Sequence, residues 1–264
     1  MNIIIPMKRV PDTETKVGVS NGQVDPNTLK SWVINPYDEY AIEEALRLIE
    51  QVGSGQITIV SMGPKKVQET IRKALAMGAH KAYHLQDDAL ENLDPMGQAR
   101  VLAAAIEKIA DYDLIWMGWK ETDDDLGQTA ILLAEFLDLP HVSTIMTVEE
   151  AGDDYVIANA EVEGGYAKVR VETPVVLTES QGPNEPRYPT LRGIMGAKRK
   201  PMTVWSVDDL DIDLDELEPL LEVVSVTKPA ARSAGRIIDG EVDESARELI
   251  RLLNEEAKVL SIAG

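Results

Sequence analysis

The chain has 264 residues, 44% of them hydrophobic, so it can bury one large core with an appendage or two small cores. A formal net charge of -20 argues against nucleic-acid binding and against contact with an anionic membrane surface, because phosphate groups are bound by basic faces. The chain has no cysteine and only three histidines, which excludes disulfides and thiolate-held metals or clusters and leaves little material for a zinc site.

The sequence also bears on location. No apolar run approaches the roughly 20 residues of a membrane-spanning helix, and residues 1–5 lack the charged start and the cleavage region of a signal peptide. We therefore expect a cytoplasmic protein that is not integral to a membrane. Because the chain has no cysteine, any redox chemistry would need a bound cofactor.

Apolar runs of strand length alternate with helical patterns up to residue 137. The expected strands are residues 3–7, 57–62, 82–85 and 113–118, and the expected helices are residues 37–49, 67–77, 95–110 and 130–137. Such alternation is typical of right-handed crossovers in a parallel sheet that helices cover on both faces. We predict an α/β fold with a doubly wound, mostly parallel sheet, which would bind ligands at the carboxyl ends of its strands.

The alternation changes after residue 140. Residues 141–148 and 155–162 are rich in β formers. A turn follows at residues 163–166, and residues 167–172 form the strand that runs back after it. This pattern predicts an antiparallel hairpin that is added to the sheet and leads into a buried strand at residues 174–178.

The composition shifts again after residue 200, where acidic residues alternate with Leu and Ile and an amphipathic helix follows at residues 242–257. We predict two parts, an α/β domain over residues 1–204 and a C-terminal arm over residues 205–264. The apolar residues of the arm must be covered, either by a separate subunit or by packing on their own domain. They are Leu210, Ile212, Leu214, Leu217, Leu220 and Leu221.

The first candidate site follows the strand at residues 113–118. Three Asp residues, 123–125, precede Gly127, Gln128 and Thr129, which stand where the helix of residues 130–137 begins. Backbone N–H groups at a helix start, together with the Thr hydroxyl and Gln amide, can bind a phosphate. The alternative is plain N-capping by the Asp run.

The second candidate site combines residues 8–12, after the first strand, with Asn35 and residues 36–40, at the entrance of the first helix. Ser61, Met62 and Gly63, at the end of another strand, would complete the same crevice. Asn35 could also serve as a helix N-cap. One function that such a crevice could serve is that of an enzyme that hydrolyses or transfers an adenylate. The sequence disfavours this function, because it has neither a P-loop with its Lys nor a matched Ser-His-Asp set.

A loop follows the strand at residues 174–178 and extends over residues 180–200. Pro183 and Pro186 stiffen it, while Arg187 and Tyr188 supply a planar cation and an aromatic tip. These properties suit a docking surface. An ordinary surface excursion at a strand exit is the alternative.

Within this loop, NEPRY is followed by TL, IM, AK and a basic run, which resembles the signature of the electron transfer flavoprotein β subunit. The segments KRVPD, NPYDEYAIEEALRL and DDDLGQT are similar to the same family in the same order, and the resemblance covers residues 1–200 well. It implies a fold like that of the adenine nucleotide alpha-hydrolases. It also implies a non-enzymatic electron carrier, the smaller subunit of a heterodimer, with FAD shared with and mostly held by the alpha subunit.

The resemblance further implies a structural AMP in the strand-end crevice. Gly127 stands where Asn is common in the family, so one side-chain contact is lost while the backbone can approach the ligand. A second FAD in the same site, as in a bifurcating type, is the alternative: VPDT and NPYDEY favour it, whereas DDDLGQT favours AMP. The implied cofactor-binding residues are Pro6, Asn35, Ser61, Met62, Gly63, Asp125, Gly127, Gln128 and Thr129.

The implied partners are the alpha subunit, which the C-terminal arm would wrap, flavin-dependent dehydrogenases and an acceptor oxidoreductase. The family's recognition loop carries a leucine anchor, and the matching position here is Pro183. Glu163, in the Gly-Gly turn, would face the flavin domain, although the turn has a plain structural explanation. The implied partner-binding residues are Glu163, Gln181, Gly182, Pro183, Asn184, Glu185, Pro186, Arg187 and Tyr188.

Overall fold

A computed structural model describes residues 1–231 and 234–260, which divide after Val226 into two compact units. The first unit is built on a nine-stranded sheet with the order β11-β10-β9-β12-β8-β1-β6-β7-β13. All neighbouring strands are parallel except the pairs that involve β10. The strands are β1 (Asn2–Pro6), β6 (Gln56–Met62), β7 (Lys81–Leu85), β8 (Leu114–Gly118), β9 (His141–Ala151), β10 (Tyr155–Val162), β11 (Gly165–Glu172), β12 (Val175–Glu179) and β13 (Met202–Trp205).

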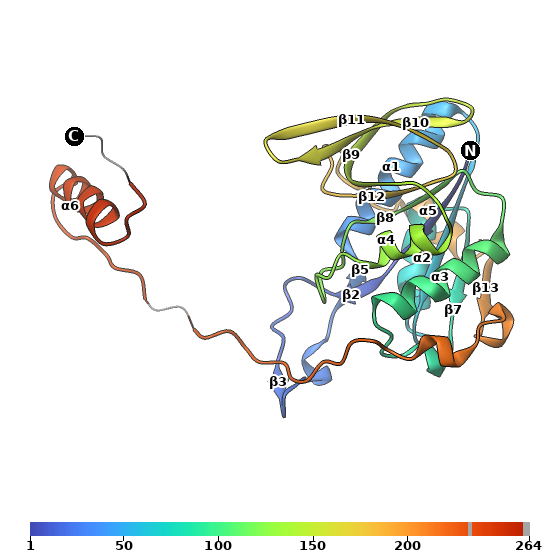
Figure 1. The fold of residues 1–264 in the computed structure, drawn as a ribbon, viewed down its shortest axis with the longest axis horizontal. Coiled ribbons are helices and arrows are strands. Elements are labelled where there is room, and N and C mark those ends of the chain that lie inside the picture. Colours follow the sequence, from blue (N-terminus) through green and yellow to red (C-terminus); the bar gives the residue numbers. More distant parts are fainter. Residues whose placement is uncertain (232–233, 261–264) are drawn as a thin grey trace. The chain divides into compact units, whose positions relative to one another are not determined.

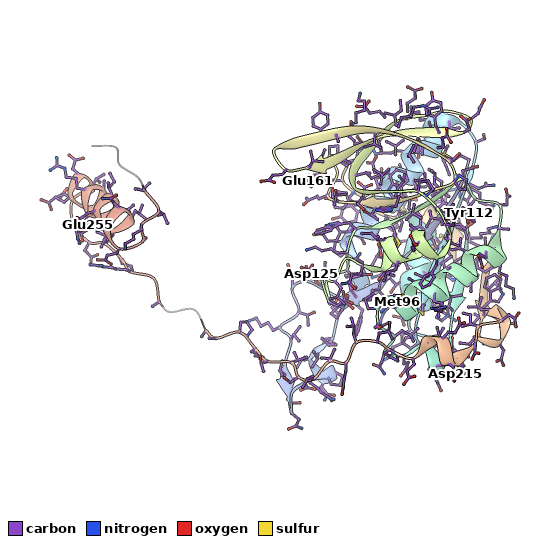
Figure 2. The ribbon with its side chains drawn as sticks, viewed as in Figure 1. Met96, Tyr112, Asp125, Glu161, Asp215 and Glu255 are labelled. Carbon is purple, nitrogen blue, oxygen red and sulfur yellow. The ribbon has the colours of Figure 1, made fainter. Side chains whose placement is uncertain are left out.

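Helices cover both faces of this sheet (Figure 1). One core cluster joins it to α1 (Pro36–Val52), α2 (Val67–Met77) and α5 (Leu191–Ala197), and the other joins it to α3 (Pro95–Ile109) and α4 (Thr129–Phe136). The predicted α/β class, the mostly parallel sheet and the antiparallel hairpin are confirmed. Glu161 lies near the tip of this hairpin, and Asp125 lies in the loop before α4 (Figure 2).

The order of the strands fixes where a ligand can bind. From β1 the chain adds β6 and β7 on one side of the sheet, then returns to place β8 on the other side. The carboxyl ends of β1 and β8 therefore lie at a topological switch point, where the loops diverge and leave a crevice.

Several elements differ from the sequence prediction. Residues 180–200 do not form one loop, because α5 begins at Leu191 with the Thr190 hydroxyl accepting a hydrogen bond from the Gly193 N–H at 3.0 Å. The edge strand β13 was not predicted. Two small antiparallel sheets also form, from β2 (Arg9–Pro11) with β5 (Trp32–Ile34) and from β3 (Val19–Ser20) with β4 (Gln23–Val24).

Residues 207–217 belong to the first unit and pack against its core. Leu210 and Leu217 are buried in the core cluster that includes α3, and Ile212 packs against it. These three residues are thus buried by their own domain and not by a separate subunit, which was one of the two alternatives that the sequence left open. The remaining members of the predicted apolar set, Leu214, Leu220 and Leu221, are exposed.

The second unit contains the predicted amphipathic helix, α6 (Val242–Glu255). On its polar face Arg251 pairs with Glu248 at 2.8 Å and with Glu255 at 2.7 Å. Over the described parts of both units, none of the helices combines the length and the apolar character needed to cross a membrane.

Candidate functional site

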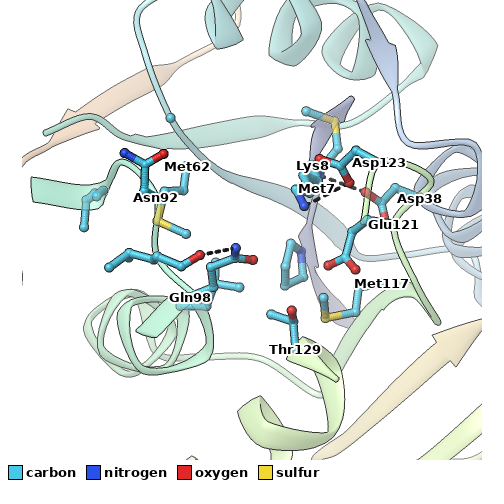
Figure 3. A pocket seen from close by; sticks show the side chains of 15 residues that line it. Met7, Lys8, Asp38, Met62, Asn92, Gln98, Met117, Glu121, Asp123 and Thr129 are labelled. Atoms are coloured by element: carbon cyan, nitrogen blue, oxygen red, sulfur yellow. Dashed lines mark hydrogen bonds and ion pairs between the residues drawn. The ribbon is translucent and has the colours of Figure 1, made fainter. Parts of the chain in front are cut away.

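A cavity of about 300 Å³ lies at the switch point (Figure 3). Its walls come from the ends of β1, β6 and β8, from the segment after β7, and from the starts of α1, α3 and α4. The lining residues are Pro6, Met7, Lys8, Asp38, Met62, Gly63, Leu90, Asn92, Leu93, Gln98, Leu102, Met117, Glu121, Asp123 and Thr129.

Asp38, in the first turn of α1, ties the two central strands together. One carboxyl oxygen accepts from the Lys8 N–H after β1 and the other from the Gly118 N–H at the end of β8, each at 2.8 Å. Burial raises the pKa of Asp38 to about 7, although both backbone N–H groups favour its charged form. The Asp38 side chain thus holds the carboxyl ends of β1 and β8 together at the wall of the cavity.

Charged groups gather on the same side of the cavity (Figure 3). The Lys8 ammonium lies 3.0 Å from a carboxyl oxygen of Asp123 and 3.0 Å from one of Asp124. Burial works to lower the pKa of Lys8, but the surrounding carboxylates outweigh it and raise this pKa. Burial raises the pKa of Glu121, which is 8% exposed. This wall offers hydrogen-bond acceptors and one paired cation.

The opposite wall is less charged. Asn92, Gln98 and Met62 lie there (Figure 3), and the Gln98 amide donates to the Leu93 carbonyl at 2.9 Å. The buried His84 ring of β7 contacts the Gly63 carbonyl through Nε2 at 2.9 Å. Because a carbonyl only accepts, Nε2 carries the proton, and burial lowers the pKa of the ring. His84 and the Leu85 carbonyl, which accepts from the Gly63 N–H at 3.0 Å, together hold Gly63 at the cavity wall.

Four of the nine predicted cofactor residues line this cavity: Pro6, Met62, Gly63 and Thr129. Thr129 is 4% exposed and is the first residue of α4, so its hydroxyl and the free N–H groups of the helix start are close to the cavity.

The other five predicted cofactor residues lie behind or beside the cavity wall. The Ser61 hydroxyl donates to the Met7 carbonyl at 2.6 Å, and the Asn35 amide donates to the Lys120 carbonyl at 3.0 Å, so both brace the crevice. Asp125 pairs with Lys120 at 2.6 Å. Gly127 has a φ of 60°, which favours glycine, and Gln128 is exposed.

The loop of residues 181–188 is seated on α1. The Arg187 guanidinium binds the Glu43 carboxylate at 2.8 Å and the Glu50 carboxylate at 2.6 Å, and its backbone N–H also donates to Glu43 at 3.0 Å. The Asn184 amide donates to Glu44 at 2.6 Å. Two residues of the predicted docking set thus brace the loop from within.

Other residues in this region face outward. Pro183 is exposed, the Tyr188 side chain is 94% exposed, and Leu191 and Met195 of α5 are 76% and 65% exposed. Both the loop and α5 therefore present exposed apolar or aromatic side chains. Glu163 is exposed at the hairpin turn and lines a separate hollow with Tyr37 and Trp119.

Comparison with known proteins identifies the family. Residues 27–210 match the family model described as the electron transfer flavoprotein domain. The chain is 42% identical to the electron transfer flavoprotein subunit beta of Bacillus subtilis (strain 168), over 98% of this chain and 100% of that protein. Proteins of the same name from Thermoanaerobacterium thermosaccharolyticum and Bos taurus are each 38% identical, over 96% and 98% of this chain and 98% and 99% of theirs.

The chain belongs to the electron transfer flavoprotein beta-subunit family. The family resemblance carried by NEPRY is confirmed, and membership implies electron transport and flavin-related chemistry. Lys8 and Asp38 belong to the second candidate site of the sequence, although no ligand contact was assigned to them, whereas Glu121 and Gln98 were not selected as site residues. Glu121 lies in the loop that follows β8, which is a signal that could have identified it, whereas Gln98 reaches the cavity from α3 through tertiary packing.

Proposed function

We propose that the chain is the beta subunit of a heterodimeric electron carrier, which passes electrons from flavin-dependent dehydrogenases to an acceptor oxidoreductase. The redox FAD is mostly held by the alpha subunit. This chain contributes a structural AMP site and a docking surface. The observation that carries the proposal is the cavity at the switch point, in a chain of this family.

The character of the cavity fits AMP. Its volume of about 300 Å³ is at the lower end of the range for ligand pockets, which suits a mononucleotide better than a dinucleotide. The Thr129 hydroxyl and the start of α4 suit a phosphate, while the Glu121 carboxylate accepts hydrogen bonds from hydroxyl or amino groups. Apolar side chains such as Leu102 and Met117 suit a base.

AMP bound here performs no redox step. The role of this chain is to hold the nucleotide in place and so to stabilise the native fold by mass action. Docking is assigned to residues 181–188, because Pro183 and Tyr188 are exposed while Asn184 and Arg187 hold the loop rigid.

The decisive experiment is to purify the chain with its flavin subunit, release the bound nucleotides and count them. We expect one AMP and one FAD per heterodimer. Two FAD and no AMP would assign the cavity to a second flavin, as in the bifurcating type. A preparation without either nucleotide would contradict the proposal.

A further inference from the structure

A buried carboxyl group that the nucleotide cavity does not use lies under the loop of residues 181–188. Glu179, the last residue of β12, is 0% exposed. Its Oε2 accepts a hydrogen bond from the Trp116 indole N–H at 2.9 Å, and its Oε1 is buried without a hydrogen-bond partner in the described structure. Leaving a charged carboxylate in that condition is costly, so the interior favours the neutral acid.

The neighbours of Glu179 reinforce this preference. Glu44 of α1, 5% exposed, supplies a second carboxyl group, and burial together with the Glu44 charge raises the pKa of Glu179 well above its ordinary value. The nearby cations are engaged elsewhere, since Arg47 and Arg187 pair with Glu43 at 2.9 and 2.8 Å. Across residues 1–231 and 234–260, no ion pair involves Glu179.

The other elements that pack around Glu179 bring little charge close to its carboxyl group. The α1 helix adds the phenol of Tyr40, whose oxygen lies 3.3 Å from the Gln181 amide. The β8 strand contributes Trp116 and no ionisable group. The ionisable groups of β9, which are His141, Glu149 and Glu150, are exposed, and α4, with its exposed Glu135, packs on the face of β12 formed by Val176.

The loop itself covers the unpartnered oxygen. A side-chain carbon on Gly182 would lie 3.1 Å from Glu179 Oε1 and 2.5 Å from the Met146 carbonyl oxygen, so only the bare backbone fits there. Two residues further on, Asn184 is anchored on Glu44. Gly182 therefore lies next to Oε1, and a movement of the segment from Gly182 to Asn184 would open this oxygen to water.

We propose that Glu179 and Glu44 form a proton-controlled seat for the loop of residues 181–188. With Glu179 protonated, the loop stays seated. When Glu179 gives its proton to solvent, its charge lies beside the Glu44 carboxyl group under a dry backbone, and the segment from Gly182 to Asn184 lifts to admit water. Glu179 is thus a positioning residue for the loop. This inference concerns the loop of the proposed function, but its test needs no dehydrogenase, so the two can fail separately.

The first test follows Trp116, which reports directly on Glu179. The full-length chain, with its co-purified partner, is labelled with 5-fluorotryptophan, and Trp116→Phe assigns the ¹⁹F resonance among those of the four tryptophans. We expect this resonance to titrate with a midpoint above the usual Glu value of about 4.3. Glu179→Gln should abolish the titration, and Glu44→Gln should move the midpoint down because a like charge is removed.

The second test follows the loop by hydrogen exchange of peptides that cover residues 181–188. Glu185→Gln, which removes an exposed carboxylate from the same loop, is the matched control. We expect wild type and Glu185→Gln to lose protection severalfold above the Trp116 midpoint, and Glu179→Gln to keep it. A Trp116 resonance that is flat from pH 5 to 9, or that still titrates in Glu179→Gln, would overturn the proposal. Equal loop protection in wild type and Glu179→Gln throughout that range would do the same.

Discussion

At the scale of single residues, Asp38 couples acid-base chemistry to the architecture. Its carboxyl group holds the ends of β1 and β8 together while its pKa lies at about 7, because burial opposes the charge that its two backbone donors favour. The folded protein therefore retains this proton up to about pH 7, whereas an unfolded Asp loses it near pH 4.

This difference sets the sign of a pH dependence. Between pH 4 and 7 the folded state binds more protons than the unfolded state. The stabilising contribution of Asp38 to the free energy of unfolding is therefore complete below about pH 4 and is lost as pH rises through 7. Asp38 changes the free energy of unfolding by at most about 1.4 kcal/mol per pH unit. Urea unfolding of wild type and Asp38→Asn between pH 4 and 8 should show a shallower decline in the variant. Asp38→Asn should also be less stable at pH 4, because an amide cannot accept from both N–H groups. Equal slopes would contradict this account.

Thr129 gives the second test at this scale. Thr129→Val keeps the shape of the buried side chain but removes the hydroxyl, and we expect nucleotide affinity to fall about tenfold, as for a lost hydrogen bond to a charged group. The melting temperature of the heterodimer should fall with occupancy. Gln128→Ala, at an exposed neighbouring position, is the comparison and should have a smaller effect. Full AMP retention in Thr129→Val, measured by chromatography of released nucleotides, would remove Thr129 from the site.

At the scale of elements, periodicity predicts the β-α alternation and the hairpin, because buried strands and amphipathic helices have distinct repeats. The rule that parallel sheets bind ligands at their strand ends places Gly63 and Thr129 near the cavity. The α5 helix escapes prediction because Gly193 and Gly196 weaken its local signal. Its C-terminal end is held by a tertiary contact, in which Arg72 donates to the Ala197 carbonyl at 2.6 Å.

The rigidity of the loop of residues 181–188, the proposed docking surface, can be tested separately from its contacts with α1. Pro183→Gly should loosen the loop and raise the apparent KM for this carrier in a dehydrogenase assay, with an effect on the order of 1 kcal/mol from backbone entropy. Flavin content and midpoint potential should not change. Arg187→Lys, which breaks the two-carboxylate clamp, should instead lower the free energy of unfolding. If KM stays constant in Pro183→Gly for every dehydrogenase partner, the loop is not the docking surface.

At the scale of the whole molecule, packing divides the chain later than composition suggests. The Asp94 carboxylate, which caps α3, also accepts from the Leu220 N–H at 2.7 Å, and Arg100 of α3 pairs with Glu216 at 2.8 Å. These contacts tie Glu216 and Leu220 to α3, within the first unit. The alternation of acidic and apolar residues over residues 205–226 fits equally well with packing on their own domain or on a partner, so the sequence could not choose between them.

Two truncations distinguish the segment packed on the first unit from the segment proposed to wrap the alpha subunit. Deleting residues 227–264 should leave the first unit folded by circular dichroism and abolish stable pairing with the flavin subunit in size-exclusion chromatography. Deleting residues 207–264 should in addition lower the melting temperature of the first unit, because it removes the buried side chains of Val207, Leu210 and Leu217, each worth about 1.5 to 3 kcal/mol. An intact heterodimer after the shorter deletion would show that the arm is not what joins the subunits, and equal melting temperatures of the two truncated chains would show that residues 207–226 do not stabilise the first unit.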